Sequence, residues 1–220
     1  MEPAAHVDAS ADGDGSPVEA RLGQIGAGGP RRDRSGGLHG LSTASVAAQP
    51  DVWSAELADG TLGPWRTEPS LPEPISHHAV LAHDGSLYVV GGLGGNPFTG
   101  EAEPRLGVYR ASIGADGALA PWERLATELA RPASTHSALI VGERLYVFGG
   151  VSGSANTDAI QRARLAEDGT LEPFEVWSTS LPAPRAHLHQ APFLAGRAYF
   201  VSGSMSPHTP VAVTWVASFE

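Results

Sequence analysis

The sequence of 220 residues has no cysteine, no lysine and no long apolar run. The absence of cysteine excludes disulfides, thiol nucleophiles and thiolate metal sites, and it leaves the redox compartment open. No run approaches the roughly 18 consecutive apolar residues that a membrane-spanning helix needs, so we expect no membrane insertion.

Charge of one sign is also scarce. All 14 basic residues are arginines, the sequence has 24 acidic residues, and the formal net charge is −10. A chain this acidic, without a basic stripe, is a poor partner for nucleic acid or anionic membrane surfaces. Residues 1–30 contain acidic groups and no apolar segment, so we do not expect them to act as a signal peptide. The compartment is not predicted: it is cytoplasmic, or secreted if the true start lies upstream.

Aromatic residues are missing from residues 1–48, which are rich in Ala, Gly, Ser and Asp. Such a segment buries too little apolar surface to offset its ordering entropy. We therefore predict a disordered or low-complexity segment over 1–48 and a folded domain over 49–220. A degenerate first half-repeat is the less favoured alternative, because no strand like LYVVGG precedes Val52.

The rest of the chain repeats one pattern. Each of three copies has a His followed ten residues later by a Tyr, within HAVLAHDGSLYVVGG (78–92), HSALIVGERLYVFGG (136–150) and HQAPFLAGRAYFVSG (189–203). Each copy pairs with a second motif, found at 52–65, 108–122 and 160–174, that contains Asp-Gly, Leu, Pro and an aromatic residue. A repeat of this size indicates units that bury their apolar faces against one another.

Asp-Gly between alternating runs predicts hairpins closed by type I′ turns, which need positive φ. These turns are Asp59-Gly60, Asp116-Gly117 and Asp168-Gly169, and Asp84-Gly85 separates another pair of strands. The second strand of each first half is continuous and apolar, as in strands buried on both faces. The spacing predicts four antiparallel strands per repeat, labelled a to d from the His strand onward, and no helix. That is the composition of a β-propeller blade.

These residues resemble kelch repeats, most closely the bacterial, Asp-Gly-rich variety. The resemblance rests on Gly91-Gly92 and Gly149-Gly150 after strand b, on the Tyr three residues before them, and on the aromatics Trp65, Trp122 and Phe174. It covers about residues 50–220. The third copy departs from it, with Ser202-Gly203 in place of Gly-Gly, so we expect less regular packing there.

The predicted fold is an all-β propeller with an incomplete ring of two full and two partial blades. The chain starts with strands c and d (Val52 to Arg66) and ends with a, b and c of the last blade. Propellers close with about four to eight blades. We favour a fragment of a longer protein, because the break falls inside a strand motif. The alternative is self-association of several copies into one ring, if the chain is complete.

Binding residues are expected on the variable b–c and d–a loops, which lie at the opposite end of the blades from the Asp-Gly turns. In the longest loop, LGGNPFTGEAEP (93–104), either Asn96 and Phe98 contact a ligand, or Asn96 caps a turn and Phe98 covers the blade edge. Arg105, Arg131 and Arg185 either bind a partner's carboxylates or are solvated surface arginines. Asp158 and His208 complete the set of candidate binding residues.

The repeated histidines His78, His136 and His189 suggest a metal, but equivalent positions in a wide ring lie too far apart to share one ion. We therefore expect structural histidines, no metal and no cofactor. Kelch-like folds also include a copper-radical oxidase whose crosslinked cofactor needs a cysteine, which this sequence lacks.

The resemblance implies a non-catalytic module that binds a protein or a glycan. The alternative is a sugar-processing enzyme of the sialic acid mutarotase kind, with Arg131, Arg185, His136 and His189 converging at the channel mouth. A purely structural role, as a spacer in a larger protein, is the third reading. The fold alone does not choose among them.

Overall fold

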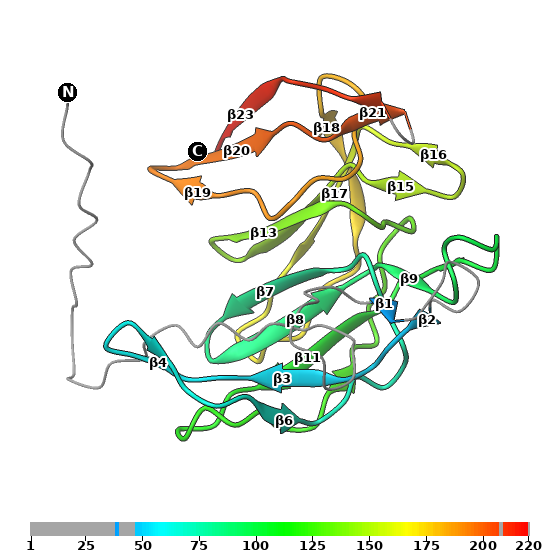
Figure 1. The fold of residues 1–220 in the computed structure, drawn as a ribbon. Coiled ribbons are helices and arrows are strands. Elements are labelled where there is room, and N and C mark those ends of the chain that lie inside the picture. The colour runs from blue at the N-terminus through cyan, green and yellow to red at the C-terminus, as the bar shows by residue number, and fades with distance from the viewer. Residues whose placement is uncertain (1–37, 40–46, 207–208, 220) are drawn as a thin grey trace, which may run out of the picture.

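The computed structural model describes residues 38–39, 47–206 and 209–219, and all regular structure in these residues is β-strand (Figure 1). No helix there is long and apolar enough to cross a membrane. Every strand pair is antiparallel, which confirms the all-β prediction. The main strands form four sheets. Sheet 1 consists of β3 (Val52–Ser54) and β6 (Arg66–Glu68), and sheet 2 of β7 (Ala79–His83), β8 (Ser86–Val90), β11 (Val108–Ser112) and β12 (Glu123–Arg124). Sheet 3 consists of β13 (Ser137–Val141), β14 (Arg144–Phe148), β17 (Ala159–Arg164) and β18 (Glu175–Ser180), and sheet 4 of β19 (Phe193–Leu194), β20 (Arg197–Val201) and β23 (Thr214–Ser218).

Short hairpins extend from these sheets. Four gather on the right of Figure 1, and the last three of them follow the second strand of a repeat: β1 (Leu38–His39) with β2 (Ala47–Ala48), β9 (Leu93–Gly94) with β10 (Glu103–Pro104), β15 (Val151–Ser152) with β16 (Ala155–Asn156), and β21 (Ser204–Ser206) with β22 (Thr209–Pro210). We call this side the loop end. A fifth hairpin, β4 (Leu57–Ala58) with β5 (Thr61–Leu62), lies at the opposite side, the turn end.

The sheets stack in chain order, with one apolar cluster between each neighbouring pair. Strand β8 shows why, because successive side chains of a strand point to opposite faces. Leu87 and Val89 pack with Val52 of sheet 1, whereas Tyr88 and Val90 pack with residues of sheet 3. These four residues of β8 are all buried, as the continuous apolar run predicts.

The Asp-Gly turns are of two kinds, which corrects the prediction that all are type I′. Asp59 and Gly60 both have positive φ, 51° and 72°, and so have Asp84 and Gly85. In the later c–d turns only Gly117 and Gly169 do. There the Asp side chain caps the turn instead, and Asp168 Oδ1 accepts a hydrogen bond from the Thr170 backbone N–H at 2.9 Å. These two turns are one residue longer than the first, which explains the different geometry.

The predicted segment 1–48 lies mostly outside the described residues. Its two described pieces, β1 and β2, pair with each other, and Ala48 is buried. The Ala48 backbone N–H donates to the Gly95 carbonyl of the neighbouring loop at 3.3 Å. The domain boundary at residue 48 stays a prediction.

Candidate functional site

The long b–c loop holds Asn96 and Phe98 in different environments. Asn96 is only 7% exposed, and its Oδ1 accepts a hydrogen bond from the Phe98 backbone N–H at 2.9 Å. Asn96 therefore shapes the loop, as the capping alternative predicts. The ring of Phe98 is 60% exposed at the tip.

Arg105 is engaged by carboxylates of its own chain. Its Nε lies 3.1 Å from Glu73 Oε2, and its Nη1 lies 3.0 Å from Glu103 Oε2. Glu73 also accepts a hydrogen bond from the buried hydroxyl of Tyr109. Arg105 thus joins the loop to the sheet, and its charge is already matched.

Arg131 keeps an exposed side chain, but its backbone is fixed. The buried amide of Gln161 accepts from the Arg131 N–H at 2.8 Å and donates to the Arg131 carbonyl at 3.0 Å. Asp158 is half-buried, and its carbonyl accepts from the Leu181 N–H at 2.8 Å. His208 lies outside the described residues.

Arg185 is neither a surface arginine nor a group that can reach a partner's carboxylate, which corrects both readings of it. The residue is 1% exposed. Its Nη1 donates to the Ser202 carbonyl at 2.6 Å, and its guanidinium carbon lies 4.0 Å from the ring centroid of Trp215. Burial lowers the pKa of this guanidinium. Arg185 therefore belongs to the interior of sheet 4.

One of the three repeated histidines does not occupy the position that the sequence alignment predicts. His77, Thr135 and His187 share a backbone position with positive φ (56°, 51° and 51°). The residues that follow are His78, His136 and Leu188, so the third copy of the repeated histidine is a leucine. His189 comes one position later, because the third repeat has one extra residue before its Tyr.

His136 is 4% exposed and His78 is half-buried, and desolvation keeps both neutral. Burial lowers the pKa of His136 to about 3, with a further contribution from His78 nearby. Burial, and then the neighbouring His77, lower the pKa of His78 to about 4. His136 lies in the packed interior, and the structural role expected for the repeated histidines stays a prediction. No group of three or more His, Asp or Glu residues in the described part of the chain is arranged to hold a metal ion.

His187 and His189 are exposed and line a cavity of about 460 Å³ at the loop end. Its other wall is formed by Val201 to Ser204 and by Pro210. His77 lies close to His187: burial first, and then the charge of His187, lower the pKa of His77. The cavity therefore has two imidazoles on one wall and a mostly apolar second wall that includes Val201 and Pro210.

This cavity brings together only part of the set that the sequence predicts. Of the four residues expected at the channel mouth, His189 lines the cavity, Arg131 is exposed, and His136 and Arg185 are buried. Sequence reasoning gave no role to His187 or Ser202. A signal for His187 was available, since His77 and His187 both stand three residues after a proline. His77 is followed directly by a second histidine, and one residue separates His187 from His189.

No protein-family model matches the chain. No curated protein matches it either. Among solved structures 159 chains match, so the fold is widely shared and does not by itself select a function.

One of these is the structure of YjhT, which aligns with a TM-score of 0.63 and 13% sequence identity. The alignment covers 92% of this chain and 64% of YjhT, so the chain spans less than two thirds of that protein. At this identity the likeness concerns the fold, which is of the β-propeller type.

The comparison corrects the leading functional expectation, a non-catalytic binding module. YjhT is a kelch-type sialic acid mutarotase. YjhT is thus an example of the sugar-processing alternative and not of the binding module.

Proposed function

We propose that the chain is a partial kelch-like β-propeller from a sugar-processing enzyme of the sialic acid mutarotase kind. In this proposal sheets 2 and 3 are full blades, and sheets 1 and 4 are the partial blades of an incomplete ring. The repeated Gly-Gly motifs, the stacking of the sheets in chain order and the likeness to YjhT support it.

The observation that carries the proposal is the cavity with His187 and His189 on its wall. Interconversion of sugar anomers needs two proton transfers. A base removes the proton of the anomeric hydroxyl, the ring C–O bond breaks as the carbonyl forms, and an acid protonates the ring oxygen. Reclosure on the other face of the carbonyl yields the second anomer. Imidazole is suited to both roles near neutral pH.

A sialic acid also carries a carboxylate, which needs a cation. Arg131 is the exposed arginine of the candidate set, and its backbone is fixed by Gln161. Arg131 is not among the residues that line the cavity, so in this proposal the carboxylate extends out of the cavity toward it. Arg185 is unsuited to this role because its guanidinium is enclosed by Ser202 and Trp215.

The test follows the approach to anomeric equilibrium by proton NMR, starting from a sialic acid released as one anomer by a sialidase. We expect the wild-type chain to accelerate the exchange. Replacing both cavity histidines (His187→Gln with His189→Gln) should reduce the acceleration by roughly 10²–10⁴-fold, the usual contribution of general acid–base groups. Arg131→Ala should raise KM more than it lowers kcat.

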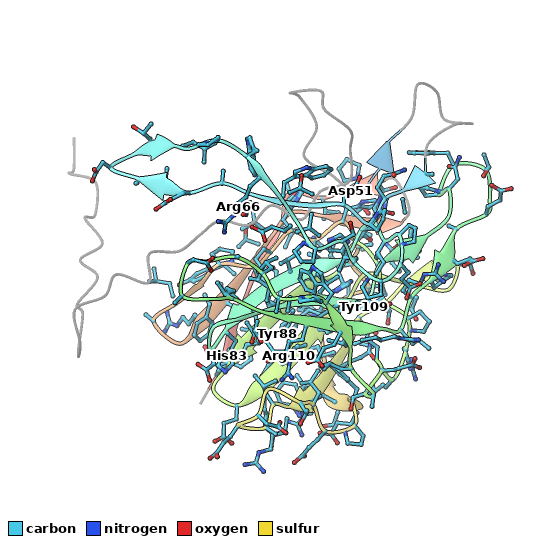
Figure 2. The ribbon with its side chains drawn as sticks, turned by 90° about the horizontal axis from the view of Figure 1, so that it is seen from below. Asp51, Arg66, His83, Tyr88, Tyr109 and Arg110 are labelled. Carbon is cyan, nitrogen blue, oxygen red and sulfur yellow. The ribbon has the colours of Figure 1, made fainter. Side chains whose placement is uncertain are left out.

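The matched control is His83→Gln. His83 lies in β7 next to the a–b turn, away from the loop end, and its Nε2 contacts the Asp84 carboxylate at 3.2 Å (Figure 2). Its replacement should leave the exchange unchanged. No acceleration above buffer by the wild-type chain, or equal losses in the control and the double variant, would refute the proposal.

A further inference from the structure

Three equivalent residues, one before each of sheets 2, 3 and 4, share a strained backbone conformation. His77, Thr135 and His187 have φ of 56°, 51° and 51°, in the left-handed region that glycine adopts most easily. Thr135 is β-branched, and for such a residue this conformation is an outlier. Strained residues cluster at ligand sites, where a side chain is needed that glycine does not supply. We call these three residues the polar row.

Backbone hydrogen bonds hold the polar row together. The Thr135 N–H donates to the His77 carbonyl at 2.9 Å, and the Leu188 N–H donates to the Thr135 carbonyl at 3.0 Å. Burial, and then the charge of His187, lower the pKa of His77, so the two imidazoles lie within electrostatic reach of each other. The row therefore brings two imidazoles and one hydroxyl together from three successive repeats.

The carbonyl groups of this region are engaged, whereas two of its hydroxyl groups are not. The carbonyls of His77 and Thr135 accept the bonds within the row, and those of Ser76 and Ser134 accept from strand N–H groups at 2.7 and 2.8 Å. Among the described residues, the buried hydroxyls of Ser134 and Thr135 have no hydrogen-bond partner. His77 Nδ1 lies 3.0 Å from Ser76 Oγ, so Nε2 is the ring atom of His77 that can contact a ligand. Buried hydroxyls without a partner indicate that an acceptor is missing here.

The charge around the polar row favours an acceptor that is an anion. Within the described part of the chain, the only ionisable groups that act on the pKa of His77, His78 and His136 are other histidines. Glu73 is the nearest carboxylate to the row in the sequence, and Arg105 already pairs with it at 3.1 Å. The net charge of −10 disfavours anions at long range, but salt screens that repulsion beyond about 8 Å. Locally, an anion would meet imidazoles and hydroxyls without a competing carboxylate.

We propose that the polar row binds a small inorganic oxyanion of the phosphate or sulfate kind. The Thr135 hydroxyl donates to one oxygen, and the imidazoles of His77 and His187 donate to others. Donors from three successive repeats suit an anion that has several equivalent oxygens. Protonated imidazoles make the stronger hydrogen bonds, so binding tightens as the pH falls through the range where histidine titrates. The site goes beyond the proposed function, although His187 belongs to both.

Histidine side-chain NMR of the full chain tests the proposal without any sugar, with phosphate and sulfate as probes and chloride at equal ionic strength as the reference. A bound anion favours the protonated imidazole, so either probe should raise the pKa of His77 toward its ordinary range. The signals of His83, at the turn end, should not respond. Thr135→Val keeps the β-branched shape without the hydroxyl and should weaken binding about tenfold. Thr99→Val is the matched control, because Thr99 is exposed in the long loop and its hydroxyl donates to Glu101. It should leave the affinity unchanged.

A second variant, Thr135→Gly, separates binding from folding. Glycine relieves the positive φ and removes the hydroxyl, so the melting temperature should not fall while anion binding is lost. A lower melting temperature with unchanged binding would assign the side chain to packing and overturn the proposal. No response of His77 to either probe, an equal response of His83, or full binding by Thr135→Val would overturn it as well. A response to acetate alone would overturn it in favour of a carboxylate ligand.

Discussion

Sheets 2 and 4 have closely similar strand b sequences, SLYVV in β8 and RAYFV in β20, but different neighbours. Sheet 2 lies between sheets 1 and 3, whereas no described residue forms a sheet beyond sheet 4. Val90 is fully buried, and its counterpart Val201 is 58% exposed. The strand pattern thus encodes burial on two faces, but each face is buried only when a further sheet stacks on it.

Two other positions differ in the same direction. Where sheet 3 has Gly149, sheet 4 has Ser202 with the same positive φ (59° and 61°). Where sheets 2 and 3 have His78 and His136, sheet 4 has Leu188. The Gly and the His of the repeat are present in sheets whose two faces are both covered, and they are absent from sheet 4. Substitutions at Gly149 and Ser202, and at His136 and Leu188, therefore test whether the covering sheet is the reason for this difference.

The largest effect is expected at the glycine. A Cβ on Gly149 would lie 2.6 Å from the Arg185 carbonyl oxygen of the following segment, in a backbone conformation that already disfavours side chains. We expect Gly149→Ser to lower the free energy of unfolding by roughly 3–5 kcal/mol. The converse change Ser202→Gly should alter it by less than about 1 kcal/mol. Urea unfolding measures both, and equal losses would show that the covering segment is not the cause.

A smaller difference is expected from one valine on each strand b. Val90→Ala removes fully buried methyl groups and leaves a cavity, so it should cost about 2–3 kcal/mol. Val201→Ala should cost less than about 0.5 kcal/mol in the monomer. If the two variants unfold at the same urea concentration, the far face of sheet 4 is covered in solution.

The strands of the fold could be predicted well because they repeat. Alternation and the Asp-Gly and Gly-Gly signals located β7, β8, β13, β14 and β20. The geometry of the c–d turns could not be predicted from Asp-Gly alone. One extra residue before the Asp changes the turn from type I′ to a turn capped by the Asp side chain. In the sequence this extra residue is visible only in the spacing of the two paired apolar residues that flank the turn, such as Leu165 and Leu171 compared with Leu57 and Leu62.

The candidate site was harder to predict, since it depends on contacts between distant segments. Arg185 looks like a surface residue in the sequence, yet Trp215 and the Ser202 carbonyl enclose it. Aligning the repeats on their tyrosines gave His189 the role that belongs to Leu188. The extra residue in the third repeat is what brings His189, with His187, to the cavity wall.

The pair His136 and Leu188 allows the acid sensitivity of sheets 3 and 4 to be compared. Burial lowers the pKa of His136 to about 3, whereas an unfolded histidine titrates near 6.5. Well above pH 6.5 the histidine is neutral in both states, so its protonation does not reduce stability. As pH falls toward the folded pKa, the unfolded chain binds a proton that the native chain does not, so stability declines.

His136→Leu should therefore reduce the loss of unfolding free energy between pH 7 and pH 4.5 by roughly 2–3 kcal/mol. Thermal unfolding across that range measures it, with Leu188→His as the reciprocal variant that should add acid sensitivity to sheet 4. An unchanged pH slope in His136→Leu would mean that the imidazole is accessible to protons in the folded chain, and would remove the packing role assigned to it.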